Sequence, residues 1–263
     1  MKKIGIVESL WRYPVKSMRG EELDQAFVGF GGVYGDRAYA FLSTGNTKGF
    51  PYFTAREKAA MLLYSPEYRN FGRMLQPLNL AEAEALGSGV TPIYADGEEM
   101  MADVLTPSGE SLPIDDPRLL ASLHQDLEEK HQLTLRQSHR AMTDCRPISI
   151  FSTQTAQQLG KEVGVDLDVR RFRANVYLDM EGAAGFSEDA LVGRTLRVGP
   201  QAVISVINRD GRCKMITLDP DTGEANPEIM KVLAREHEGK AGLYAAVLVE
   251  GTITPGDTVM LLD

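Results

Sequence analysis

A cysteine flanked by two cations is the residue of this sequence best suited to chemistry. Cys213 lies between Arg212 and Lys214, after the turn-forming pair Asp210–Gly211 and an apolar run over 202–207. The apolar run predicts a buried strand that ends close to the cysteine. Neighbouring cations favour the thiolate, which is the form that binds a metal or attacks an electrophile. A small buried hydrophobe is the other common use of such a cysteine, and local sequence leaves both open.

Two further stretches imitate ligand-binding loops and are rejected. The run Asp219–Gly223 has the aspartate spacing of a calcium loop, but Gly223 and Met230 lack the oxygen ligands that their positions would require. The glycines within 29–32 suggest a dinucleotide loop, yet an apparent strand over 38–42 follows where that motif needs a helix. The sequence therefore predicts neither a calcium site nor a dinucleotide site at these positions.

Basic residues gather in three short stretches of an otherwise acidic chain. The ranges 12–19, 170–173 and 209–214 each hold three of the 28 lysines and arginines, and each lies at an apparent strand edge or turn. Functional groups are commonly presented at such positions. Because arginine forks grip phosphate, these basic islands suggest an anionic small-molecule ligand. Solvated charge with a few salt bridges is the alternative for any one island.

Length and composition are those of an ordinary globular protein. The 263 residues can hold one large or two small domains, and the formal net charge of −9 argues against nucleic acid or an anionic membrane as the main partner. Two cysteines, Cys145 and Cys213, do not make a disulfide scaffold and fit a reducing cytoplasm, which is the predicted location. No apolar run has the length of a transmembrane helix, so no membrane span is predicted.

Short strands dominate the elements that must position these residues. Apolar runs bounded by turn formers predict strands over 3–11, 21–28, 38–42, 133–136, 147–151, 176–179, 195–198, 202–207, 244–249 and 258–262, with a hairpin over 104–114. Helices are predicted over 54–63, from Pro117, from Ser152 to Gly160 and over 227–236. Because helices and strands do not alternate regularly, the sequence predicts a β-rich α+β fold of barrel-like sheets with a few peripheral helices.

The helix predicted from Pro117 also marks the expected domain boundary. We divide the chain into residues 1–114 and 115–263 at this point. His124 and His131 would lie on this helix about two turns apart, too far to share one metal ion without other ligands, and are predicted to be exposed to solvent. Residues 70–100 have weak periodicity and are expected to be partly loop.

The motifs together resemble the molybdenum-cofactor sulfurase C-terminal (MOSC) family, preceded by its usual N-terminal β-barrel-like domain. The matching stretches are Tyr13–Ser17, Gly35–Arg37, Arg171–Asn175 and Arg212–Cys213 followed by Thr217 and Asp219–Gly223. Ala174 takes the place of the usual proline in the family's Arg-Phe-Arg-Pro-Asn motif. The resemblance covers almost the whole chain, and it implies that 1–114 is the N-terminal domain and 115–263 the MOSC domain.

The resemblance implies a molybdenum cofactor, in which the metal is held by a pyranopterin (molybdopterin). In members such as the mitochondrial amidoxime-reducing component, the cysteine that matches Cys213 ligates molybdenum, and soft thiolate suits that metal. The positions that match contacts to the pterin and its phosphate are Lys16, Ser17, Arg37, Arg173, Asn175 and Arg212. Ser152 is a weaker match to a polar loop residue, and Cys145 is taken as structural.

Three functions follow from the resemblance, and we favour the first. The first is an oxidoreductase that reduces N-hydroxylated or N-oxide-like small molecules; since the chain lacks cysteines for an iron–sulfur cluster, a separate donor protein would supply the electrons. The second is a sulfur carrier or transferase with a persulfide on Cys213. The third is a non-catalytic cofactor-binding protein. Asp36 is expected to position Arg37, and Asp219 to hold the Cys213 loop, unless both merely form turns.

Overall fold

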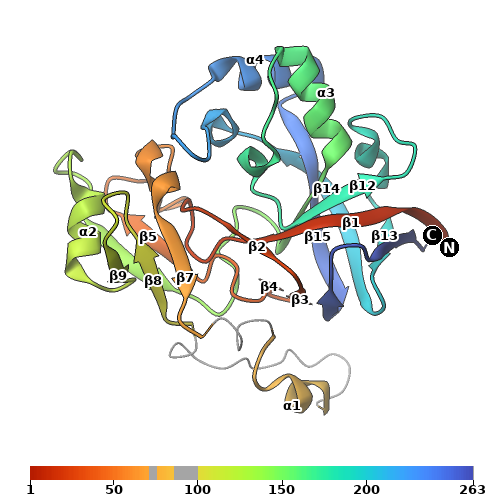
Figure 1. Cartoon of the computed structure of the whole chain (residues 1–263), viewed down its shortest axis with the longest axis horizontal. Coiled ribbons are helices and arrows are strands. Elements are labelled where there is room, and N and C mark those ends of the chain that lie inside the picture. Colours follow the sequence, from red (N-terminus) through yellow and green to blue (C-terminus); the bar gives the residue numbers. More distant parts are fainter. Residues whose placement is uncertain (71–75, 86–99, 263) are drawn as a thin grey trace.

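A closed barrel of seven strands lies right of centre in Figure 1. The computed structural model describes residues 1–70, 76–85 and 100–262. The barrel strands are β1 (Lys2–Arg12), β11 (Ile148–Ser152), β12 (Val176–Met180), β13 (Thr195–Val198), β14 (Ala202–Gly211), β15 (Lys240–Val249) and β17 (Thr258–Leu261). Their order is β12-β11-β15-β14-β13-β17-β1, and β1 pairs again with β12 to close the ring. The β11–β12 pair is parallel and the other pairs are antiparallel.

Alternating apolar residues fill the barrel, and a glycine lets it close. In β14, Ala202, Ile204 and Val206 are buried while the residues between them are partly exposed. Full burial of a side chain such as that of Ile204 or Val206 contributes about 1.5–3 kcal/mol through removal of apolar surface from water. A Cβ on Gly5 of β1 would lie 2.2 Å from the carbonyl oxygen of Asp179 on β12. The two closing strands can therefore approach each other only because glycine occupies that position.

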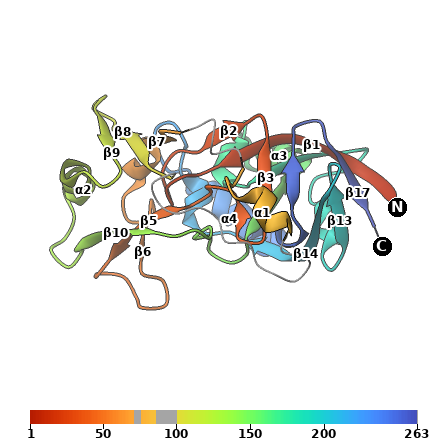
Figure 2. The same cartoon turned by 90° about the horizontal axis from the view of Figure 1, so that it is seen from below.

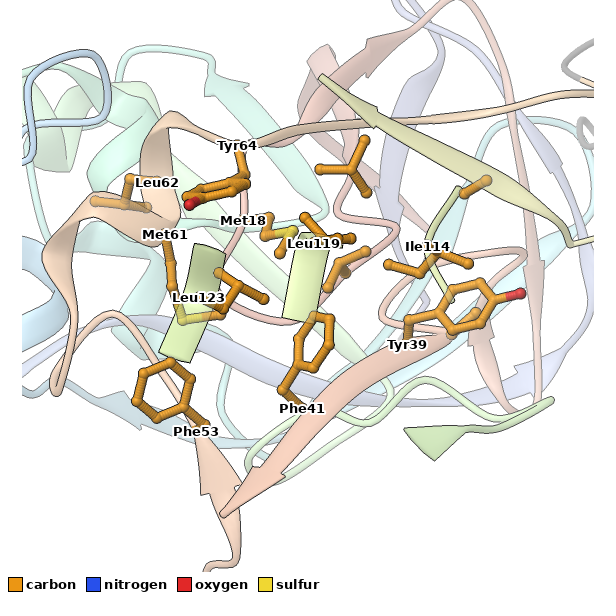
Figure 3. Packing of buried hydrophobic residues seen from close by; sticks show 14 of the residues in the cluster. Met18, Tyr39, Phe41, Phe53, Met61, Leu62, Tyr64, Ile114, Leu119 and Leu123 are labelled. Atoms are coloured by element: carbon orange, nitrogen blue, oxygen red, sulfur yellow. The ribbon is translucent and has the colours of Figure 1, made fainter. Parts of the chain in front are cut away.

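Smaller sheets make up the rest of the molecule. β2 (Glu21–Leu23) extends the barrel sheet beyond β1. The three small sheets consist of β5 (Tyr39–Ser43), β6 (Tyr52–Phe53) and β10 (Leu133–Gln137); of β3 (Ala26–Gly29), β4 (Gly32–Val33) and β16 (Gly251–Ile253); and of β7 (Ser65–Tyr68), β8 (Ala102–Leu105) and β9 (Ser111–Pro113). Figure 3 shows the core that the first and third of these sheets share, in which Leu119 and Leu123 of α2 (Pro117–His124) face Phe41 and Phe53. Most buried residues of the second sheet pack with the barrel core.

Two helices cover one end of the barrel. α3 (Thr153–Val163) and α4 (Pro227–His237) lie together at the top of Figure 1, and a third apolar cluster fills the space beneath them. Asn226 caps α4 by accepting a hydrogen bond from the Glu228 amide at 3.2 Å, and Gly164 ends α3 in the left-handed region at φ +80°. α1 (Leu80–Ala85) is a short helix outside the barrel, at the bottom of Figure 1. Both ends of the chain lie close together in Figures 1 and 2, because β1 pairs with β17.

The β-rich α+β fold with a barrel is confirmed, and several boundaries differ from the predictions. The strand predicted over 21–28 is interrupted and forms β2 and β3. The helix predicted over 54–63 is a turn followed by a 3₁₀ helix, Ala59–Leu63. Much of the loop predicted over 70–100 lies outside the described residues. The structure also shows strand β8 starting at Ala102, as the predicted hairpin requires.

The predicted histidine-bearing helix is shorter than expected. α2 ends at His124, so His131 does not share a helix with it. His131 is buried, contrary to the prediction, and its Nδ1 lies 2.7 Å from the Ser43 hydroxyl. The division at 114/115 stays a prediction: β1 lies within the barrel, and β10 pairs with β5, so strand pairing crosses that point in both directions. Among the described residues, no helix is long and apolar enough to cross a membrane.

Candidate functional site

All seven residues predicted to form a site line one pocket. The pocket lies where loops at the ends of β11, β12 and β14 meet loops of the smaller sheets. Its predicted members are Lys16, Ser17, Arg37, Arg173, Asn175, Arg212 and Cys213. They come from segments almost 200 residues apart in sequence, between Lys16 and Cys213. The convergence of these residues is thus a property of the folded chain.

Cys213 and Arg212 lie just beyond a bulge at the end of β14. The pairing of β14 with β15 shifts register between Arg209 and Gly211, which redirects the chain before Cys213. The Cys213 residue is half-buried. The Arg212 guanidinium donates to the carbonyl oxygens of Ala241 at 2.7 Å and Phe172 at 2.8 Å, and Nη1 lies 2.9 Å from Asp210 Oδ2. Arg212 is therefore fixed in place, with its charge balanced by Asp210.

Lys16 is a buried ammonium with one carboxylate partner. Its Nζ donates to the Met142 carbonyl oxygen at 2.8 Å and forms an ion pair with Asp144. Burial lowers the pKa of Lys16, although Asp144 opposes that effect. Burial by itself would raise the pKa of Asp144, but Lys16 outweighs it and holds that pKa below the usual carboxyl range. The Asp144 carboxylate therefore favours the charged form of Lys16, against the effect of burial.

Arg37 and Arg173 share an aromatic platform but differ in their partners. Their guanidinium carbons lie 4.7 Å and 4.2 Å from the ring centre of Tyr13. Arg37 Nη1 lies 2.5 Å from Asp36 Oδ2, and Asp36 Oδ1 accepts from the Tyr13 amide at 2.8 Å. Asp36 thus positions Arg37, in addition to its place in a turn. Arg37 Nη2 also donates to the Arg173 carbonyl oxygen at 2.9 Å.

Arg173 is a half-buried cation, and it has no carboxylate partner among the described residues. Its Nη2 is buried and has no hydrogen-bond acceptor there. Burial, reinforced by the like charge of Arg37, lowers the pKa of Arg173 to about 10. An uncompensated buried charge is costly, so the site is incomplete in electrostatic terms. An anion in the pocket would complete it.

Strained backbone is concentrated at the same positions. Ser17, Arg37 and Arg173 have φ values of 68°, 45° and 52°, in the left-handed region that non-glycine residues seldom adopt. They are three of the six such non-glycine residues in the described part of the chain. Each such residue costs about 1 kcal/mol or more, and strain of this kind clusters at functional sites. The backbone therefore marks the pocket independently of its charge.

Family models match the two halves of the chain. The model of the MOSC domain matches residues 137–260, and that of the MOSC N-terminal beta barrel domain matches residues 4–103. The chain belongs to the MOSC family. The division into two family regions agrees with the resemblance in the sequence motifs.

Curated relatives of this MOSC protein are molybdenum cofactor sulfurases. The one from Drosophila mojavensis is 27% identical over 63% of the chain, and the one from Drosophila willistoni 29% identical over 54%. These alignments span 22% and 17% of the relatives, so the chain matches about a fifth of their length. Among solved structures, the YuaD protein of Bacillus subtilis is 15% identical, with a TM-score of 0.47 over 97% of this chain and 93% of that one.

Asn175 and Asp219 mainly organise backbone in this MOSC protein. The Asn175 side chain accepts from the Ser149 amide at 3.2 Å and donates to the Trp11 carbonyl oxygen at 3.3 Å, which ties β1 to β11. Asp219 accepts from the amides of Asp221 and Thr222, each at 3.0 Å, so it stabilises its own turn. Its other oxygen accepts from Arg171 at 2.7 Å.

Several pocket residues were not identified from the sequence. The missed charged and hydroxyl-bearing side chains include Arg56, Asp144, Arg146, Ser149, Asp210 and Tyr244. Asp210 was interpreted as a turn former, and Arg56 belongs to a stretch interpreted as a helix start, so local signals concealed their place in the pocket. Ser152 does not line the pocket; its hydroxyl donates to Gln154 at 2.8 Å. Cys145 is exposed, which does not suit a packing role.

The pocket is strongly cationic in a protein of net charge −9. Two carboxylates line it, Asp144 and Asp210, together with seven cations. The cations are Lys16, Arg37, Arg56, Arg146, Arg171, Arg173 and Arg212. Within the described ranges, no group of three or more histidine, cysteine, aspartate or glutamate side chains is placed to hold a metal ion. The chemistry of the lining is that of an anion site with one thiol.

Proposed function

We propose that this pocket binds the molybdenum cofactor and that the protein is an oxidoreductase. The observation that carries the proposal is Arg173, whose Nη2 is buried without a hydrogen-bond partner and which lacks a carboxylate partner among the described residues. It lies beside six other cations and Cys213. An anionic phosphate supplies the missing negative charge, and a thiolate supplies the soft ligand that molybdenum accepts. MOSC membership and relatives named for that cofactor support the same assignment.

The residues present fit the proposed cofactor. Cys213 would ligate the metal, while Arg173 and Lys16 would face the phosphate and the polar edges of the pterin. Arg37 is held by Asp36, and Arg212 by Asp210 and two carbonyl oxygens, so neither has to be ordered when the cofactor binds. Pre-organised donors lose little conformational entropy on binding. Ser17 and Asn175 would border the same ligand from the loop after β1 and the start of β12.

The reaction we propose is the reduction of an N-hydroxylated small molecule. Two electrons and two protons enter, the N–O bond breaks, and the reduced nitrogen compound and water leave. When bound, the cofactor would supply the redox-active metal for this electron transfer. The chain would bind and orient the reactants, with the cationic pocket lining stabilising negative charge near Cys213. The electrons would come from a separate donor protein, and we place the reaction in the cytoplasm.

A sulfur carrier is the second candidate. It is favoured by the sulfurase names of the curated relatives and by the half-buried thiol of Cys213. In this function the Cys213 thiolate would attack the terminal sulfur of a cysteine persulfide on a donor protein. The donor thiolate would leave, and Cys213 would hold the transferred sulfur as a new persulfide. Both candidates need the same thiolate in the same pocket, and they differ in whether the protein carries metal or labile sulfur.

Replacement of each cysteine by serine tests the proposal. Protein from a host that makes the cofactor would be analysed for molybdenum, pterin, labile sulfur and turnover of benzamidoxime with an artificial electron donor. We expect molybdenum in the wild type, loss of molybdenum and turnover in Cys213→Ser, and retention of both in Cys145→Ser. Because serine keeps the size and removes the soft ligand, Cys213→Ser should unfold at about the wild-type temperature.

The outcomes separate the candidates. Labile sulfur on Cys213 without molybdenum in the wild type would replace the oxidoreductase by the carrier. Molybdenum without turnover of any N-hydroxylated compound would leave a non-catalytic binding protein. Wild-type protein with neither molybdenum nor sulfur, together with a strongly destabilised Cys213→Ser variant, would make Cys213 a packing residue and refute the site.

A further inference from the structure

The mouth of the pocket carries two cations that the cofactor assignment does not use. Arg56 comes from the loop before the 3₁₀ helix Ala59–Leu63, and Arg146 from the loop before β11. Neither forms an ion pair with a described carboxylate. Arg146 is exposed and Arg56 is half-buried, whereas Lys16 and Arg212 lie deeper, with side chains 6% and 8% exposed. The pocket thus has an inner set of cations and an outer pair.

The outer cation Arg56 is held in position before any ligand arrives. Its guanidinium carbon lies 4.3 Å from the ring centre of Phe50, and Nε donates to the Thr54 hydroxyl at 3.2 Å. Thr54 is itself fixed, because its hydroxyl donates to Glu57 at 2.6 Å. No hydrogen bond with a described residue engages the two Nη groups of Arg56. An arginine guanidinium that is already oriented and still has free N–H donors is suited to bind the carboxylate or phosphate of a ligand.

The pocket already stabilises one anion of the chain itself, the Asp144 carboxylate. Asp144 forms an ion pair with Lys16. The positive charges of Arg37 and Arg56 also help to lower the pKa of its carboxyl group. Arg146 follows it by two positions on the same loop. The Arg56 carbonyl oxygen accepts from Lys214 Nζ at 3.4 Å, so the Arg56 loop lies against the residue next to Cys213. An anionic group at the mouth would accordingly be close to the reactive end of the pocket.

We propose that Arg56 and Arg146 form a second anion subsite, and that the substrate carries an acidic group which binds there. This inference rests on the proposed function, since it names the substrate class of the same pocket. The acidic group is a carboxylate or phosphate at one end of the substrate, and the N-hydroxyl group at the other end faces Cys213. Opposite charge at the mouth raises the rate of encounter and fixes which end enters first.

A charge-matched pair of substrates tests the subsite. Turnover of benzamidoxime and para-carboxybenzamidoxime would be measured on the metal-loaded protein, and the ratio of their kcat/KM values taken as the preference. We expect the wild type to prefer the carboxylate, and Arg56→Gln and Arg146→Gln each to reduce the ratio about three- to tenfold. Arg194→Gln is the matched control, because Arg194 is exposed and does not line the pocket. Ionic strength of about 0.5 M should also erode the preference.

Binding of the same two compounds, measured by calorimetry, separates failure of the subsite from failure of the proposed function. Tighter binding of the carboxylate, weakened by Arg56→Gln and Arg146→Gln, supports the subsite even if neither compound is turned over. Equal binding and equal turnover of the two compounds by the wild type would overturn the subsite and leave the oxidoreductase intact. A loss of preference as large in Arg194→Gln would also overturn it, because net charge would then be the cause. If Arg56→Gln does not fold, Arg146→Gln carries the test, because Arg146 is exposed and its replacement should still reduce the preference.

Discussion

The lone charge of Arg173 leads to a prediction about the stability of the cofactor-free protein. Methionine has a similar length and no charge, and its unbranched Cβ leaves the left-handed backbone at φ 52° about as strained as before. We predict that Arg173→Met stabilises the cofactor-free protein while it abolishes cofactor retention. Stability and binding then change in opposite directions, as expected for a group selected to meet a ligand.

The magnitude follows from the pKa of Arg173, which burial lowers from the usual arginine value to about 10. A fall of that size corresponds to about 3 kcal/mol against the charged form in the folded protein. At neutral pH the guanidinium is charged in both the folded and the unfolded chain, so the whole cost is present, and it is relieved only as pH rises through about 10. Loss of the stacking on Tyr13 at 4.2 Å removes about 1–2 kcal/mol of favourable interaction. The net gain is about 1–2 kcal/mol.

Thermal unfolding of cofactor-free protein at neutral pH measures this gain. The melting temperature should rise by about 5 °C, given about 2–4 °C per kcal/mol for a chain of this length. Arg171→Met is the control, because Arg171 is paired with Asp219 at 2.7 Å and its removal should lower the melting temperature. Inorganic phosphate should stabilise the wild type more than Arg173→Met. If Arg173→Met is destabilised as much as Arg171→Met, Arg173 is not an uncompensated charge and the electrostatic argument fails.

Three further predictions concern other parts of the pocket. Arg37→Lys should retain about tenfold less cofactor than the wild type, measured as pterin per protein, because ammonium lacks the fork that Asp36 orients; full retention would contradict this. Asp144→Asn should lower stability to urea at neutral pH by leaving Lys16 without its carboxylate. Since the pKa of Asp144 is lowered on folding, this contribution is present above about pH 4 and is lost as the pH falls below it, so an equal loss at acidic pH would refute the ion pair. The purified chain should not couple oxidation of NADH or NADPH to benzamidoxime reduction by itself, and robust single-component turnover would remove the need for a separate donor.

Several strands were predictable because a short apolar run bounded by turn formers is typical of a buried strand. β1, β5, β12 and β13 lie within one or two residues of their predicted ranges.

The helix predicted over 54–63 is not formed, for a specific reason. The Thr54 and Glu57 side chains make the expected capping bonds, with the Thr54 amide donating to Glu57 at 2.8 Å, but a turn follows them. Here the local signal was correct for the hydrogen bonds and wrong for the element, since packing of Met61 and Leu62 decides the conformation that follows.

The sequence identified seven residues of the pocket through its motifs, but not Arg56, Asp144 or Asp210, which lie outside them. It did not determine how their charges are paired. Arg171 and Arg173 are two positions apart, yet the first meets Asp219 and the second meets no described carboxylate. Some of these ion pairs are local, such as Arg37 with Asp36, but Lys16 and Asp144 are distant in sequence, so their pairing is decided when the barrel and the smaller sheets pack together. The same packing sets the burial that shifts the pKa values. It thereby makes Arg171 an ion-paired arginine and leaves Arg173 without a carboxylate among the described residues.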